Sequence, residues 1–210
     1  MAKLEEYRRK RRFDRTPEPS GEPVAGKAED KPAPAAKRTR LPKPKLPQLE
    51  VRPGAEHGDT FVVQKHRATR LHYDFRLAID GTLKSWAVPK GPSQSHADKR
   101  LAVMTEDHPL DYGNFEGKIP EGNYGAGTVM VWDRGTFHVE GNLGALKQLE
   151  KGEIKFSLNG EKLRGSFVLV KLKQSEKGNE WLMIKHKDAA EDSSWNIDEH
   201  EGSAITGRTL

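Results

Sequence analysis

The stretch "HRATRLHYDFRL", residues 66–77, concentrates side chains that can do chemistry. If this stretch forms a strand, His72, Asp74 and Arg76 alternate with apolar side chains and share one face. His72 and Asp74 then lie about 7 Å apart along the strand and can bind the same divalent cation. Arg76 follows on the same row, where its planar guanidinium suits the oxygens of a phosphate beside that cation. His66, on the preceding strand or in the turn, can supply a third ligand.

A His/His/Asp set is not specific to one metal or one reaction. It accepts Mn²⁺, Zn²⁺ or Fe²⁺, and a similar ligand set occurs in non-haem iron oxygenases. Arg76 argues against oxygenase chemistry, because a cation beside the ligands suits an anionic substrate better than dioxygen. A third interpretation is an ordinary hydrogen-bonded or ion-paired His–x–Asp pair on a wet strand face, without a metal.

A loop downstream of a predicted strand holds two more candidates. "TEDHPLDYGNFEGKIPEGNYGAG", residues 105–127, contains His108 and Tyr112. Loop histidines beside a metal site commonly donate a proton or bind phosphate, and an ordinary surface imidazole is the alternative for His108. The glycines are spaced like a phosphate-binding loop, but no helix pattern follows them, so turns and bulges are the better interpretation.

Short strand patterns with glycine-rich turns dominate the chain from Thr60 onward. Segments such as "TFVVQKH" and "LHYDFRLAI" alternate or run apolar. The pair Asp80–Gly81 before "TLKSWAV" predicts a tight hairpin. Only "ALKQLEKG", residues 145–152, has a helical pattern in this part of the chain. The sequence therefore predicts a mainly β fold, a compact antiparallel β-barrel with one short helix.

Three polar residues of the predicted barrel are further candidates. Ser85 lies on the strand after the hairpin, Lys90 lies at its exit, and Arg100 opens the next strand. Lys90 and Arg100 are cations suited to the backbone of a nucleic acid, although each taken singly is an ordinary surface charge.

The excess positive charge lies in the N-terminal part of the chain. The 210 residues carry a net charge of +5, residues 1–50 hold 14 Lys/Arg against 8 Asp/Glu, and residues 51–210 hold 22 against 23. Residues 1–50 also hold 8 of the 13 prolines. A flexible basic arm of this kind attracts a polyanion through counterion release, and a solvated linker is the alternative.

Composition also divides the chain and excludes some classes of protein. There is no cysteine, which excludes a disulfide, a thiolate zinc site and a cysteine nucleophile. No run of about 18 apolar residues occurs, so we expect no membrane partner and a cytoplasmic, nucleoid-associated location. Four parts are expected: a basic N-terminal segment (1–20), a proline-rich disordered linker (21–56), the barrel (57–190) and a polar tail (191–210).

The chain resembles the 3′-phosphoesterase domain of bacterial DNA ligase D in four motifs, "QKHRATRLHYDFRL", "LKSWAVPKGPS", "RLAVMTEDHPLDYGNFEGKIPEGNYGAGTVMVWDRG" and "WLMIKHKD". The opening "LEEYRRKRRFDRTPEPSG" resembles that domain's N-terminal segment, so the resemblance covers roughly residues 1–20 and 57–190. It implies a compact β-barrel with a divalent-metal site, typically for Mn²⁺, with Zn²⁺ or Co²⁺ as alternatives.

The resemblance also implies roles for individual residues. His66, His72 and Asp74 correspond to the metal ligands, while Arg76 and His108 correspond to groups that contact the scissile phosphate. The positions that match family residues tied to activity or to phosphate binding are Tyr112, Gln64, Ser85, Lys90, Arg100, Arg11 and Glu18.

The implied activity is trimming of the 3′ end of a DNA primer strand in non-homologous end joining. A terminal ribonucleoside is removed to leave a 3′-phosphate, which is then hydrolysed to a 3′-hydroxyl. Arg12 stands where the family's N-terminal segment usually has aspartate, and that segment contributes to the ribonucleoside step. Expected partners are primer–template 3′ ends and a separate DNA ligase, polymerase or end-binding repair protein, with this chain acting as a stand-alone protein. A catalytically silent module that binds DNA ends and recruits a ligase is the alternative.

Overall fold

The computed structural model describes residues 4–22, 59–174 and 177–210. The predicted linker 21–56 lies outside the described residues except for Gly21 and Glu22. Of the basic arm that was expected to be flexible, residues 4–22 are described and pack on the barrel, and residues 23–50 lie outside the described residues.

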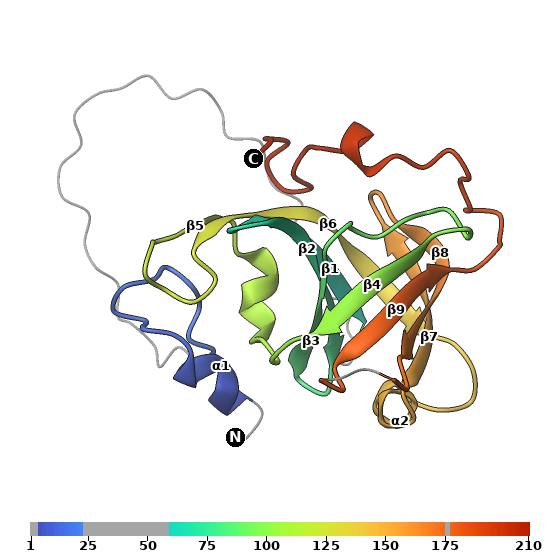
Figure 1. The fold of residues 1–210 in the computed structure, drawn as a ribbon, viewed down its shortest axis with the longest axis horizontal. Coiled ribbons are helices and arrows are strands. Elements are labelled where there is room, and N and C mark those ends of the chain that lie inside the picture. Colours follow the sequence, from blue (N-terminus) through green and yellow to red (C-terminus); the bar gives the residue numbers. More distant parts are fainter. Residues whose placement is uncertain (1–3, 23–58, 175–176) are drawn as a thin grey trace, which may run out of the picture.

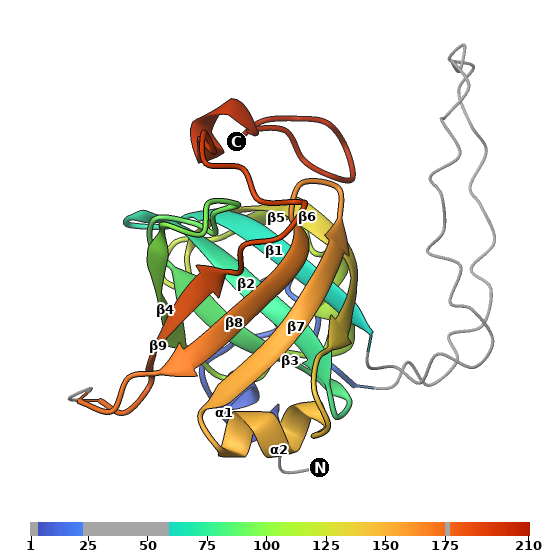
Figure 2. The same ribbon diagram turned by 90° about the vertical axis from the view of Figure 1, so that its right-hand side faces the viewer.

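The described chain forms an antiparallel β-barrel, as the sequence predicts. Eight strands close it in the order β1-β2-β3-β4-β9-β8-β7-β6, with β6 pairing back onto β1, and short β5 is added to the start of β6. Figure 2 shows the barrel wall from the side of β7, β8 and β9. The bounds of the strands are β1 Thr60–Arg67, β2 Leu71–Ile79, β3 Thr82–Val88, β4 Lys99–Met104, β5 Gly117–Ile119, β6 Gly127–Val139, β7 Glu153–Gly160, β8 Arg164–Lys171 and β9 Glu180–Lys185.

Short helices accompany the barrel. The predicted helix of the barrel region is α2, Ala145–Glu150, and a further helix, α1, spans Glu5–Arg9. Among the described residues two short 3-10 helices, η2 and η3, span Leu110–Asn114 and Ile197–Glu199. Within the described residues no helix is long and apolar enough to cross a membrane.

The hairpin between β2 and β3 forms where the sequence predicts it. Asp80 and Gly81 have φ angles of 53° and 77°. Positive φ at both central residues is the requirement of a type I′ turn, whose twist matches that of the paired strands. This turn sets the register in which Arg76 on β2 faces Ser85 on β3.

One side of the barrel wall is buried on both faces. The barrel interior is filled by a cluster that includes Phe75, Trp86 and Trp132. A second cluster lies outside the wall, where Tyr7 and Tyr112 pack on residues of β1, β2, β3 and β6. We call residues 4–22 and 105–126, which lie over this outer face, the covering layer. In Figure 1, α1, η2 and β5 gather on this side of the barrel. The layer explains why β1 is buried without alternation at its six central residues.

The C-terminal segment, residues 191–210, contains no strand, and it packs on the barrel rather than extending from it. Trp195 and Ile197 pack against the interior cluster, and the indole Nε1 of Trp132 donates a hydrogen bond to His200 O. The amide of Ala204 donates to Val131 O at 2.9 Å. Figure 2 shows this segment across the end of the barrel opposite α2. The predicted polar tail is therefore part of the folded unit.

Candidate active site

The alternation of β2 separates an apolar face from a polar row. Tyr73, Phe75 and Leu77 point into the barrel interior, as the strand pattern predicts. Leu71 departs from that expectation, because it lies at the first residue of β2 and is 44% exposed. His72, Asp74 and Arg76 occupy the opposite, outer face beneath the covering layer.

His66, His72 and Asp74, which we call the metal triad, converge on one point. The register of β1 and β2 places His66 directly opposite His72. His66 Nδ1 and His72 Nε2 each lie 3.6 Å from an oxygen of Asp74. One ligand atom from each residue lies within 4.8 Å of the others. Ligands about 2.1 Å from one cation stand roughly 3.0–3.5 Å apart at octahedral or tetrahedral angles. The two 3.6 Å distances lie close to this range, and any separation near the 4.8 Å limit would have to shorten around a shared cation.

Backbone carbonyls orient both imidazoles for metal binding. His66 Nε2 lies 2.9 Å from Gly125 O, and His72 Nδ1 lies 3.0 Å from Arg70 O. Because a carbonyl oxygen only accepts, the ring protons lie on these two nitrogens. The lone pairs of the remaining nitrogens, His66 Nδ1 and His72 Nε2, therefore face Asp74. Such outer hydrogen bonds are the usual means of fixing the tautomer of a metal-binding histidine.

Asp74 is ionised in this environment. Burial alone would raise its pKa, but the neighbouring Arg76 guanidinium outweighs burial and holds the pKa well below its usual range. The donor set therefore consists of two imidazole nitrogens, His66 Nδ1 and His72 Nε2, and one carboxylate. This set fits Mn²⁺, Zn²⁺, Co²⁺ or Fe²⁺, and the residues alone do not select one.

Three hydrogen bonds hold Arg76 beside the triad. Its Nε donates to Gln64 Oε1 at 2.8 Å, Nη1 to Ser85 Oγ at 2.8 Å, and Nη2 to Asp74 Oδ2 at 3.1 Å. Gln64 is itself anchored, since its Nε2 donates to two carbonyls of the covering layer at 3.0 Å. A guanidinium has five N–H groups, so these partners among the described residues leave one N–H on each Nη. Two donors remain for the oxygens of a phosphate.

His108 lies on the other side of Ser85 and is held as a neutral imidazole. Its Nδ1 lies 2.9 Å from Glu106 O, and its Nε2 lies 3.2 Å from Nη2 of Arg11. The proton is therefore on Nδ1, and Nε2 accepts from the guanidinium. Burial, together with the charges of Arg76 and Arg11, lowers the pKa of His108 well below its usual value.

The N-terminal segment completes the site through a buried ion-pair network. Arg11 donates to Glu18 Oε1 at 2.8 Å and to Glu106 Oε1 at 3.0 Å. Tyr112 donates its hydroxyl to the same Glu18 oxygen at 3.1 Å, and burial raises its pKa, so it stays a neutral donor. Arg11, Glu18 and Tyr112 were expected here by resemblance, whereas no role was expected for Glu106. No local pattern distinguishes Glu106 from the other acids of its loop.

Three positions from the sequence analysis lie apart from this network. Lys90 is exposed, two residues beyond Val88 at the end of β3. Arg100 shares the interior-facing side of β4 with Ala102 and pairs with Asp98 at 2.7 Å. Arg12 is exposed, so its replacement of aspartate leaves the buried contacts of Arg11 in place. The structure therefore shows no contact of these three residues with the triad or with Arg76 among the described residues.

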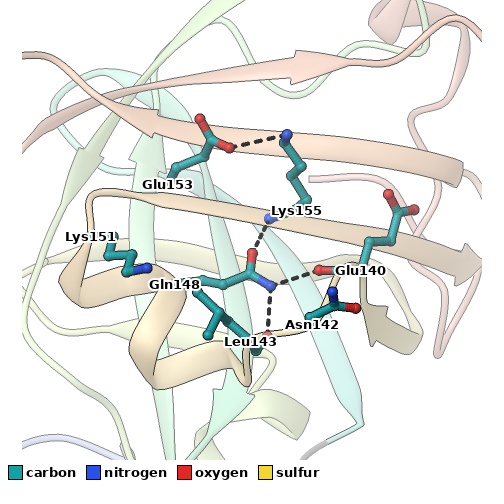
Figure 3. A pocket seen from close by; sticks show the side chains of 8 residues that line it. Glu140, Asn142, Leu143, Gln148, Lys151, Glu153 and Lys155 are labelled. Atoms are coloured by element: carbon teal, nitrogen blue, oxygen red, sulfur yellow. Dashed lines mark hydrogen bonds and ion pairs between the residues drawn. The ribbon is translucent and has the colours of Figure 1, made fainter.

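A separate hollow of about 410 Å³ lies beside α2 and does not belong to this site. Figure 3 shows that Gln148 bridges its wall, donating to two backbone carbonyls and accepting from the amide of Lys155. The polar atoms of Gln148 are thus used to hold the loop before α2. The hollow is lined by Glu140, Gly141, Asn142, Leu143, Gln148, Lys151, Glu153 and Lys155.

Comparison with known proteins establishes the class. Residues 64–171 match the model of the DNA Ligase D 3′-phosphoesterase domain, a range that includes the triad, Arg76 and His108. The chain therefore belongs to the DNA ligase D 3′-phosphoesterase domain family.

Particular relatives are all described as LigD proteins of non-homologous end joining. The chain is 45% identical over 210 residues to the protein of Pseudomonas aeruginosa, a match that covers 99% of this chain and 22% of that protein. It is 37% identical over 198 residues to the protein of Mycobacterium tuberculosis, covering 93% of this chain and 21% of the relative. It is 44% identical over 141 residues to the protein of Mycolicibacterium smegmatis, covering 65% of this chain and 18% of that relative. The chain spans about a fifth of the length of these relatives.

Proposed function

We propose that this protein is a metal-dependent phosphoesterase that processes the 3′ ends of DNA strands. It removes a 3′-phosphate, and a 3′-terminal ribonucleoside before it, to leave the 3′-hydroxyl that a ligase needs during double-strand break repair by non-homologous end joining. One observation carries the proposal. The ligand atoms of His66, His72 and Asp74 lie beside the buried guanidinium of Arg76, which has two N–H groups without a partner among the described residues. The family match and the end-joining relatives support a phosphoester of DNA as the substrate.

His66, His72 and Asp74 would hold the cation, with Mn²⁺ as our first choice and Zn²⁺ or Co²⁺ as alternatives. A divalent cation there supplies Lewis-acid activation of a phosphate ester. Arg76 directs its two remaining N–H groups at the non-bridging oxygens and stabilises the negative charge that develops on them. Gln64, Ser85 and Asp74 keep that guanidinium in one orientation, which avoids reorganisation during the reaction.

His108 is suited to the departing 3′ oxygen once substrate is bound. In the free protein it is neutral, because burial and two guanidiniums disfavour its protonation. An incoming phosphate anion offsets those cations and raises the pKa of His108, which is what a general acid requires. Three further residues act by positioning. Arg11 contacts His108, and Glu18 holds Arg11 by accepting a hydrogen bond from it. Tyr112 in turn donates a hydrogen bond to Glu18.

The test uses a labelled primer–template that ends in either a 3′-phosphate or a single 3′-terminal ribonucleotide, incubated with Mn²⁺. We expect the wild type to produce a 3′-hydroxyl and His72→Ala to lose at least about a hundredfold in rate, because a metal ligand is removed. His138→Ala, an exposed histidine on β6, is the matched control and should behave as wild type.

Two results would contradict this proposal. Equal rates for wild type and His72→Ala would remove the triad from the reaction. Tight binding of both substrates without conversion would favour the silent end-binding module instead. The second substrate also reports whether the ribonucleoside step proceeds with Arg12 in place of aspartate.

A further inference from the structure

Tyr124 is the only exposed aromatic side chain among the described residues. Its exposed fraction is 48%, whereas the other aromatic rings of the described chain are buried or half-buried. A large flat ring in water contributes nothing to the core, and none of the roles assigned above uses it. Its position in the covering layer, between β5 and β6, places it at the edge of the candidate active site.

A backbone turn fixes the position of Tyr124 beside the metal triad. Tyr124 and Gly125 are the central residues of a turn closed by a hydrogen bond from Ala126 N to Asn123 O at 3.2 Å. Gly125 has a φ of 74°, as the third residue of a type II turn requires. The carbonyl of Gly125 accepts from His66 Nε2 at 2.9 Å, so the residue directly after Tyr124 contacts a metal ligand.

Two cations lie against the ring on the side of the N-terminal segment. Lys10 Nζ lies 4.9 Å and Arg11 Cζ 5.5 Å from the ring centroid. Both cations are also paired with Glu106, which fixes them beside the ring. Exposed aromatic rings beside cations occur in proteins that bind single-stranded nucleic acid, because bases stack on the ring while cations attract the phosphates.

We propose that Tyr124 is a stacking platform for the base of the 3′-terminal nucleotide, which places the terminal phosphate at the triad and Arg76. This inference rests on the proposed function, since it assumes that a DNA 3′ end enters the site. Tyr124 acts here as a positioning residue. It touches the base and not the scissile bond. A stacking platform is tolerant of sequence, because every base presents a π-face.

The experiment measures binding without turnover. A primer–template with 2-aminopurine as its 3′-terminal base, and a matched one with an abasic 3′ terminus, are titrated with protein in EDTA. Wild type should quench 2-aminopurine and bind the base-bearing end about 5- to 150-fold more tightly than the abasic end, the range expected for one base–aromatic stack. Tyr124→Ala should bring that ratio close to one, while Tyr124→Phe and the surface control Leu143→Ala should keep it.

Several outcomes would overturn the platform. They are an unchanged ratio in Tyr124→Ala, no preference for the base-bearing end in wild type, and an equal loss of affinity for both ends. The last would mean that Tyr124 only supports Lys10 and Arg11. If wild type binds both ends equally well but converts the 3′-phosphate normally, the platform alone is refuted. If wild type prefers the base-bearing end in EDTA as expected but does not convert the 3′-phosphate in Mn²⁺, the platform is supported and the proposed activity is refuted.

Discussion

Replacing Arg76 with methionine tests the electrostatic basis of the site. The side chains of Arg76 and Asp74 are only 3% and 12% exposed, so they form a buried ion pair. Removing one partner of such a pair leaves an uncompensated buried charge and costs about 3–5 kcal/mol of unfolding free energy. Since 1 kcal/mol shifts Tm by about 2–4 °C in a protein of this size, we expect Arg76→Met to lower Tm by about 6–20 °C.

The penalty should depend on pH with a defined sign. The pKa of Asp74 is held below its usual range in the folded protein, so the ion pair stabilises the fold fully above the unfolded pKa of about 3.9. That stabilisation is lost as the pH falls from there through the lower folded pKa. Arg76→Met removes the main cause of the lowered pKa. The unfolded state is common to both proteins, so the difference in unfolding free energy between wild type and variant should shrink as the pH falls from the pKa of Asp74 in the folded variant towards its lower pKa in the folded wild type.

Urea unfolding in EDTA, at pH 7 and at several lower pH values, measures this difference without a bound metal. The double variant Asp74→Asn/Arg76→Met is the control, because the neutral amide removes the uncompensated charge. It should be more stable than Arg76→Met alone at pH 7. A loss below about 1 kcal/mol for Arg76→Met, or a double variant less stable than the single one, would refute the reasoning.

Two further predictions concern the start of β6 and the covering layer. Gly127 has a φ of 147°, and a Cβ there would lie 2.3 Å from Arg67 O, so Gly127→Ala should lower the unfolding free energy by about 2–6 kcal/mol. Gly122, with a φ of 82° and open space around it, is the control, and its change to alanine should lower the unfolding free energy by only about 1–2 kcal/mol. Equal losses for the two variants in denaturant unfolding would contradict the close approach of residue 127 to Arg67 O. An NMR titration of the free protein should find His108 still neutral at pH 6. The variant Arg11→Met should raise the pKa of His108, because one of the two neighbouring cations is removed. A pKa near 6.5 in wild type would argue against the buried environment of His108 between two guanidiniums.

The sequence alone determined those features that depend on neighbouring residues. Alternation along residues 71–77 placed His72, Asp74 and Arg76 on one face, because strand geometry has a period of two. Asp80–Gly81 predicted the hairpin because few dipeptides adopt positive φ at both positions. The motifs also indicated the family that the comparison establishes.

The tertiary structure decided which residues surround that row. Closure of the barrel pairs His66 with His72, and the covering layer brings Arg11 to His108 across 97 positions of the chain. No local pattern distinguishes Glu106 from the other acids of its loop, yet it is buried against Arg11, while Arg100 pairs with Asp98 away from the site. Periodicity and turn chemistry are local, so sequence patterns report them. Burial, hydrogen-bond partners and the resulting pKa shifts arise from segments distant in sequence that meet only in the folded chain.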